Sequence, residues 1–276
     1  HEERAKLGER ERVFFAKMCE KFQPSLAIVT GDNSDHRCKG MFEESAGAVT
    51  NLFTEAKVPF AITFGNHDTE VIGEGWYTAA EEWEFYRRAG GRYFVDRHDP
   101  SVVGGGTSRI RVLDGKGKPG FDLCVLDSGD YGPQTEAVLT STKKPSDLWP
   151  SACDSVRAPQ VAWARKALAE GVPSLFFQHI IVPEIYDALK EVKLPGAYIY
   201  AHIYDKTRYF TFDPNTENHG MLHEYPCPGY YNHGQFEAMV SRGDVLAMFT
   251  GHDHTNCFSV KYKGINIVNG RKIYVR

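Results

Sequence analysis

The chain has 276 residues, of which 42% are hydrophobic and 25% charged, a composition that excludes collagen-like, disordered and coiled-coil proteins. Its 32 Lys and Arg residues against 36 Asp and Glu residues give a formal net charge of -4, so there is no electrostatic reason to expect a nucleic acid duplex as a partner. No stretch approaches the roughly 18 consecutive apolar residues of a membrane span, so no membrane span is expected.

The hydrophobic pattern predicts helices that alternate with short apolar strands. The expected helices cover residues 9–22, 41–57 and 159–170, and the expected strands cover residues 26–30, 60–64, 123–126, 174–177 and 245–249. Such alternation is typical of an α/β fold, in which helices cover buried and largely parallel strands. No repeat or long linker interrupts the pattern, so residues 1–276 are interpreted as a single domain. Residues 194–234 show little periodicity and are expected to form a long functional loop.

Histidine and cysteine are the residues whose positions most affect the interpretation. The chain has 11 histidines, and histidine is both a common metal ligand and the usual acid or base near neutral pH. The 6 cysteines are scattered singly, without a CxxC pair, which excludes a zinc ribbon or a thioredoxin-type motif. Isolated buried thiols are the simpler interpretation of these cysteines, and one or two disulfides are the alternative.

Polar clusters follow four of the expected strands directly. These clusters are Thr30 to Asp35, Phe64 to Asp68, Gln178 with His179, and Thr250 to His254. Ligands in open α/β sheets bind at the carboxyl ends of the strands, so the four clusters are expected to meet in space. Together they supply a set of oxygen and imidazole donors, namely Asp32, Asn66, His179, His252 and His254. Such a set suits divalent or trivalent first-row metal ions, and one carboxylate with two oxygens can bridge a pair of ions.

Each cluster taken alone also has an ordinary structural interpretation. Gly31-Asp32 after a strand is a common turn, and a histidine such as His179 is often simply hydrogen-bonded in a half-buried position. His252 and His254 stand two residues apart, on one side of an extended segment, which suits a ligand pair as well as a plain loop. The four clusters in this order favour the metal-site interpretation.

This order of motifs resembles that of the calcineurin-like metallophosphoesterases. Members of that superfamily carry Asp-x-His, Gly-Asp, Gly-Asn-His-Asp/Glu, a lone His and Gly-His-x-His. The chain matches four of these five blocks with Gly31-Asp32, Gly65 to Asp68, His179 and Gly251 to His254. Residues 126–131, 226–234 and 251–256 look like a branch related to purple acid phosphatases but lacking their extra N-terminal domain. The resemblance implies a four-layer α-β-β-α sandwich of two mixed β-sheets flanked by helices.

The first block lacks its aspartate. His1 stands where the histidine of that block is expected, which predicts that the aspartate and the first strand lie upstream of this sequence; an unstructured terminal residue is the alternative for His1. The resemblance implies two metal ions, of manganese, iron or zinc. One ion would be held by His1, Asp32 and His254, and the other by Asp32, Asn66, His179 and His252.

The resemblance also implies a mechanism. A hydroxide that bridges the two metals would attack phosphorus in line, while His67 would hydrogen-bond the substrate and protonate the leaving oxygen. Asp35 resembles a carboxylate that orients this histidine in the Ser/Thr phosphatases of the superfamily. Purple acid phosphatases place a tyrosine ligand there, so Asp35 argues against their iron chemistry. A helix N-cap or turn is the alternative role for Asp35.

These observations predict a dinuclear-metal-dependent phosphoesterase, most simply a phosphomonoesterase acting on a phosphorylated small molecule or phosphoprotein. A phosphodiesterase of the same fold is one alternative, because the sequence does not identify the pocket for the leaving group. A catalytically silent metal-binding module is the other alternative. The presence of His67 beside nearly every ligand argues against a silent module, since a binding scaffold does not need a proton donor.

Overall fold

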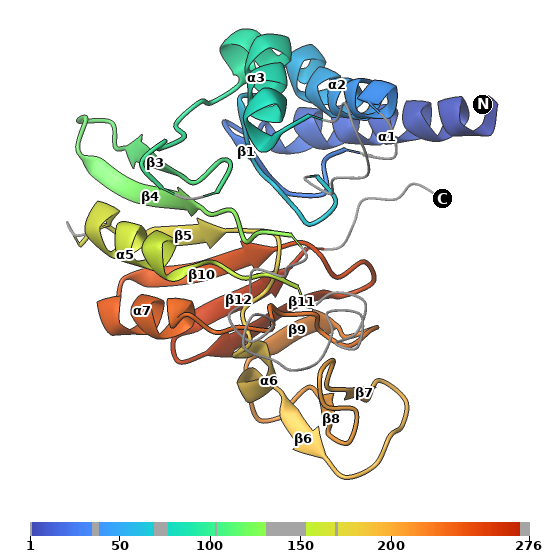
Figure 1. Cartoon of the computed structure of the whole chain (residues 1–276), viewed down its shortest axis with the longest axis vertical. Coiled ribbons are helices and arrows are strands. Elements are labelled where there is room, and N and C mark those ends of the chain that lie inside the picture. Colours follow the sequence, from blue (N-terminus) through green and yellow to red (C-terminus); the bar gives the residue numbers. More distant parts are fainter. Residues whose placement is uncertain are drawn as a thin grey trace.

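The computed structural model describes residues 2–34, 39–68, 77–102, 104–130, 153–168 and 171–270. It shows a mixed α/β protein with a large mixed sheet and flanking helices (Figure 1), and the predicted fold class is confirmed. Two separate clusters of buried apolar side chains stabilise the fold, one beside a small N-terminal sheet and the other on the large sheet.

The N-terminal cluster is built on two parallel strands, β1 (Ala27–Thr30) and β2 (Phe60–Thr63). Helices α1 (Glu2–Phe22), α2 (Lys39–Ala56) and α3 (Ala79–Gly90) gather at this end of the molecule (Figure 1). All four residues of β2 are buried, as expected for a strand that is covered on both faces. The helices and β2 share a largely aromatic core of Phe42, Ala46, Phe53, Val58, Phe60, Ile62, Phe64, Tyr86 and Phe94.

The large sheet has seven strands in the order β3-β4-β5-β10-β12-β11-β9. Its strands are β3 (Ser108–Leu113), β4 (Pro119–Val125), β5 (Ser174–Phe177), β9 (Asn218–Met221), β10 (Val245–Thr250), β11 (Cys257–Tyr262) and β12 (Ile265–Asn269). The four central strands β4, β5, β10 and β12 are parallel, and the strands outside them are antiparallel to their neighbours. The carboxyl ends of the central strands therefore share one edge of the sheet, which is where the predicted ligands follow β5 and β10.

Helices α5 (Ala158–Ala167) and α7 (Gln235–Arg242) cover this sheet. Phe236 and Met239 of α7 share one buried cluster with Met248 of β10, so the helix is held by apolar packing. Among the helices of the described residues, none is both long enough and apolar enough to cross a membrane.

Residues 194–234 differ from the expected irregular loop. They contain β7 (Tyr200–Ala201), β8 (Tyr209–Thr211) and β9, and β9 forms an edge of the large sheet. β7 and β8 pair with β6 (Lys190–Val192) in a three-stranded sheet that follows the short helix α6 (Ile185–Ala188). Strands of two to four residues are too short to show a clear alternation of apolar and polar residues, which is why the pattern did not reveal them.

Other boundaries agree closely with the expected elements. β5 has the predicted bounds, and α2, α5, β1 and β10 begin and end within three residues of them. α1 begins at Glu2, earlier than the predicted start at residue 9, because its first turns are charged and carry no apolar periodicity. Residues 119–122 belong to β4, so that strand begins earlier than expected. β3 and β4 pair antiparallel and form a hairpin.

Candidate metal centre

Four segments that leave the carboxyl ends of strands meet at one place. Asp32 follows β1, Asn66 follows β2, His179 follows β5 and His252 follows β10. Main-chain contacts join the segments, since the Gly251 amide donates to the His179 carbonyl at 3.0 Å. The predicted convergence of these clusters is therefore present in the fold.

The Nε2 atom of His179 lies close to donor atoms from the other three segments. It is 2.9 Å from Oδ1 of Asn66, 3.3 Å from Oδ1 of Asp32 and 3.2 Å from Nδ1 of His252. Neighbouring ligands that each bind one ion at about 2.0–2.2 Å lie roughly 3 Å apart, so these separations suit a shared metal ion.

The tautomer of His179 supports the same conclusion. Its Nδ1 atom lies 2.8 Å from the carbonyl oxygen of Thr30, which can only accept a hydrogen bond, so Nδ1 carries the proton in the neutral ring. Nε2 then presents its lone pair to the oxygens of Asn66 and Asp32. Lone pairs directed at one another repel unless a cation lies among them. The donors are a carboxylate, an amide oxygen and two imidazoles, a set that fits a first-row metal ion.

Glycine residues allow this close approach. A Cβ atom on Gly65 would lie 2.4 Å from both N and Oδ1 of Asp32, and one on Gly31 would lie 2.7 Å from Nδ1 of His179. Two ligand residues also have positive φ angles, +54° at Asp32 and +68° at His252. Non-glycine residues seldom adopt this conformation, and such strain concentrates at functional sites. A side chain at Gly31 or Gly65 would therefore occupy the space of the candidate ligands.

Asp68 holds two of the ligand-bearing loops together. Its fully buried carboxylate accepts hydrogen bonds from the main-chain N–H groups of Asn33, Ser34 and Gly65 at 2.7, 3.0 and 2.7 Å. The Ser34 hydroxyl donates a further bond at 3.0 Å. This clamp fixes the loop after β1 against the loop after β2. A charged residue shortly after a buried strand is the one sign of this role in the sequence, but the N–H groups that it binds are known only from the fold.

The two neighbouring carboxylates differ in pKa. Burial, with a smaller contribution from the charge of Asp32, raises the pKa of Asp68 to about 6, and the hydrogen bond from Gly65 opposes both effects. Burial acts in the same direction on Asp32, but His179 in its protonated form outweighs burial through a hydrogen bond and its charge, and lowers the pKa of Asp32 well below its usual range; the neutral form of His179 is the one that leaves Nε2 free for a metal ion. Asp32 therefore ionises at a lower pH than Asp68.

The predicted site residues divide into a buried group and an exposed group. Asn66 and His179 are buried, with exposed fractions of 0% and 2%, while Asp32 and His252 are partly exposed. His67, in the loop after β2, and His254, in the loop after β10, have exposed side chains. The main-chain N–H of His67 donates to Oδ1 of Asp32 at 3.0 Å, which places His67 beside the converging donors. His1 and Asp35 lie outside the described residues.

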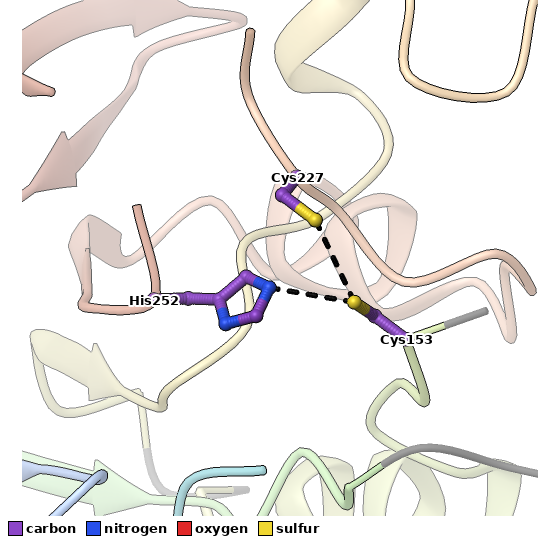
Figure 2. A group of neighbouring side chains, drawn as sticks. All are labelled: Cys153, Cys227 and His252. Atoms are coloured by element: carbon purple, nitrogen blue, oxygen red, sulfur yellow. Dashed lines mark hydrogen bonds between the residues drawn. The ribbon is translucent and has the colours of Figure 1, made fainter. Parts of the chain in front are cut away.

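Two cysteines lie beside this centre. The sulfur of Cys153 is 3.4 Å from Nε2 of His252 and 3.5 Å from the sulfur of Cys227 (Figure 2). The described cysteines are free thiols, as the simpler interpretation expected, but Cys153 and Cys227 are not isolated from each other. Because 74 residues separate the two cysteines, their spacing in the sequence carried no signal of the contact.

Together, the mixed α/β fold and the donor set at its strand ends define a metal-dependent class of protein. The family model described as calcineurin-like phosphoesterase matches residues 7–256. The chain belongs to the calcineurin-like phosphoesterase family, and the predicted resemblance is confirmed. Membership in this family implies that the protein binds metal ions.

Curated relatives and a solved structure agree with this assignment. The chain is 38% identical to the probable inactive purple acid phosphatase 14 of Arabidopsis thaliana over 271 residues, and 25% identical to the probable inactive purple acid phosphatase 29 of the same plant over 274 residues. These matches cover 89% and 94% of this chain but only 57% and 61% of the relatives, so the chain spans a little over half of their length. A dimetal phosphatase from Danio rerio aligns with 95% of this chain and 76% of its own, with a TM-score of 0.56 and 12% identity, and supports the fold alone.

Proposed function

We propose that this chain is a dinuclear-metal-dependent phosphomonoesterase. The observation that carries the proposal is the approach of three donor atoms, from Asp32, Asn66 and His252, to within 3.3 Å of the unprotonated nitrogen of His179. These side chains come from four separate strand ends, and the Asp68 clamp and the close glycine contacts hold their loops in place.

The residues divide between two ions. One ion would be held by Asp32, Asn66, His179 and His252, and the other by His1, Asp32 and His254, with Asp32 bridging the two. Manganese, iron and zinc all suit these oxygen and imidazole donors. When bound, a pair of such ions supplies an acidified water and neutralises negative charge on the phosphoryl oxygens.

His67 is the proposed proton donor. Its side chain is exposed, so a substrate can reach it, while its own main-chain N–H is fixed on Oδ1 of Asp32. A phosphate ester bound at the metal centre would then lie beside the imidazole. His67 would donate a hydrogen bond to the ester and give its proton to the departing alcohol oxygen. Asp35 is proposed to orient this ring.

A phosphodiesterase of the same chemistry and a catalytically silent metal-binding protein are the other candidate functions. The silent protein is favoured by one observation, that the curated relatives are named as probable inactive phosphatases. The presence of His67 favours catalysis, because metal binding alone does not need an exposed imidazole beside the ligands. Because these two observations point in opposite directions, measuring ester turnover decides between an enzyme and a silent metal-binding protein.

The test is manganese-dependent hydrolysis of an aryl phosphate monoester and of the matching bis-aryl phosphate diester. The assay uses this chain and a longer protein in which the expected upstream aspartate is present. Faster turnover of the monoester supports the proposal, and faster turnover of the diester supports the phosphodiesterase. Metal binding by both proteins without turnover of either ester would establish the silent module.

A further inference from the structure

A pair of thiols lies against the outer nitrogen of a candidate metal ligand. The sulfur of Cys153 contacts both Nε2 of His252, at 3.4 Å, and the sulfur of Cys227, at 3.5 Å (Figure 2). One nitrogen of His252 and the two sulfurs all lie within 4.8 Å of one another. Both contacts meet at Cys153, so a chemical change of its sulfur affects the histidine directly.

The main chain holds both cysteines in place. The N–H of Cys227 donates to Oδ1 of Asp253 at 3.1 Å, and Asp253 is the residue next to His252. The carbonyl of Cys153 accepts a hydrogen bond from the N–H of Tyr230 at 3.0 Å, which ties it to the segment that carries Cys227. The two thiols are therefore held facing each other by the fold.

The ring of His252 joins the thiol pair to the metal centre. Its Nδ1 atom faces His179 at 3.2 Å, while its Nε2 atom faces Cys153. A neutral imidazole that binds a metal through Nδ1 carries its proton on Nε2 and needs an acceptor there. Acceptors in this position orient the ring and increase its basicity, and their removal typically lowers metal affinity by about 10–100-fold.

We propose that Cys153 and Cys227 are a redox-active thiol pair, and that their oxidation to a disulfide weakens the hold of His252 on the metal. This inference rests on the proposed metal-binding function of His252. The sulfur of reduced Cys153 can accept a hydrogen bond from the Nε2–H of His252, whereas a disulfide sulfur is a poorer acceptor. Oxidation thus removes the partner that orients and activates the ring.

A peroxide is the class of oxidant that can reach this site, because it is small and Cys153 is buried. The Cys153 sulfur, after loss of its thiol proton, attacks one peroxide oxygen, which breaks the O–O bond, forms a sulfenic acid and releases hydroxide; this hydroxide takes up the proton that the thiol has lost and becomes the first water. The sulfur of Cys227 then attacks the sulfenic sulfur, displacing hydroxide, and its thiol proton completes a water molecule. Two thiols and one hydrogen peroxide give one disulfide and two waters.

A metal ion bound directly by the two sulfurs and His252 is the competing use of these residues. Such an ion would take the Nε2 atom of His252 while Nδ1 faces His179, so one neutral ring would have to serve two ions. Cobalt(II) distinguishes the cases, because sulfur ligation produces an intense sulfur-to-cobalt charge-transfer absorption. We expect no such band when the reduced protein is loaded with cobalt(II), and its appearance would overturn the proposal.

The first measurement is the cross-link itself. The full chain is treated with one equivalent of hydrogen peroxide, digested without reduction and analysed by mass spectrometry. We expect one peptide that contains both Cys153 and Cys227 and that dithiothreitol separates. Wild type and Cys257→Ser should behave alike, because Cys257 is an exposed residue of β11 and serves as the matched control. Absence of this cross-linked peptide overturns the proposal, and this readout does not depend on metal binding or turnover.

The second measurement is the manganese affinity of the reduced and oxidised forms. We expect affinity to fall about 10–100-fold on oxidation and to recover with dithiothreitol. Without oxidant, Cys227→Ser should keep the wild-type affinity, since Cys153 still faces His252, while Cys153→Ala should lower it to a similar extent as oxidation. A cross-link that leaves affinity unchanged overturns the coupling. Normal coupling without ester hydrolysis refutes the proposed enzyme and leaves this inference standing.

Discussion

The Nε2 atom of His179 lies 2.9 Å from the Oδ1 atom of Asn66, although 113 residues separate them in the sequence. The Thr30 carbonyl accepts a hydrogen bond from Nδ1 of His179, and this bond fixes the orientation and the tautomer of the ring. Both donors are buried, so the folded protein presents them to an ion with little reorganisation. Their positions lead to predictions about metal binding, stability and catalysis.

Metal binding should stabilise the folded protein through His179. An ion that binds only the folded state adds about 2.7 kcal/mol to the free energy of unfolding at a concentration of 100 times its Kd. We expect manganese to raise the melting temperature of the wild type and a chelator to reverse the rise. His179→Ala should abolish most of this shift, because it removes the nitrogen around which the other donors gather. Thermal unfolding with and without metal measures the effect.

His219→Ala is the matched control for this experiment. His219 is an exposed residue of β9, in the antiparallel part of the large sheet. Its replacement should leave the metal-induced shift intact. An equal shift in wild type and His179→Ala would show that manganese binds elsewhere.

Gly65 should be intolerant of a single added methyl group. The Cβ atom of alanine would lie 2.4 Å from Oδ1 of Asp32 and 2.9 Å from the His179 ring, so either a ligand or the backbone must move. We expect Gly65→Ala to lower manganese affinity at least about tenfold and to destabilise the fold by about 1–3 kcal/mol. Gly115→Ala is the control, since a Cβ there meets nothing within 4 Å. Isothermal titration of both variants with manganese measures the two affinities, and equal affinities would contradict the predicted crowding at Gly65.

The Asp68 clamp should be a major contribution to stability. Asp68→Ala leaves the N–H groups of Asn33, Ser34 and Gly65 without their acceptor, and each unsatisfied buried group costs about 1–3 kcal/mol. We expect the free energy of unfolding in denaturant to fall by roughly 3 kcal/mol or more. Asp68→Asn keeps one acceptor oxygen and should lose less. A loss below about 1 kcal/mol for the alanine variant would mean that water replaces the carboxylate without penalty.

The sequence predicted these features to different extents. The long periodic elements and the four strand-end clusters were visible, because apolar runs that end in polar groups identify the edge of a parallel sheet. The clamp by Asp68 was not visible, since it depends on which main-chain N–H groups the loops direct inward. The contact between Cys153 and Cys227 was equally hidden, because it arises only when segments far apart in the sequence pack together. The short strands β7 and β8 carried too few residues for a pattern.

His67 provides the test that separates catalysis from metal binding. If it protonates the leaving oxygen, His67→Ala should lower kcat by about 10²–10⁴-fold while the metal content stays near that of the wild type. Esters with very acidic leaving alcohols should lose less, because they need less protonation. Metal analysis and steady-state kinetics on the same preparations measure both effects. Loss of metal together with activity would show that His67 is a ligand or a structural residue.

Glu82 should make stability depend on pH in a distinctive direction. This residue of α3 is 0% exposed, and burial, with a smaller contribution from the charge of Asp68, raises its pKa to about 9. The pKa of an unfolded glutamate is about 4.3. The folded state therefore retains a proton that the unfolded state releases, and the stability that this proton provides is complete below about pH 4.3 and is lost as the pH rises toward 9.

Glu82→Gln removes this loss, so its advantage over wild type should grow with pH by up to about 1.4 kcal/mol per unit. Denaturant unfolding at pH 5, 6.5 and 8 measures the difference, with the exposed Glu44→Gln as the control. A constant difference between Glu82→Gln and wild type across this range would mean that Glu82 titrates at its ordinary pKa.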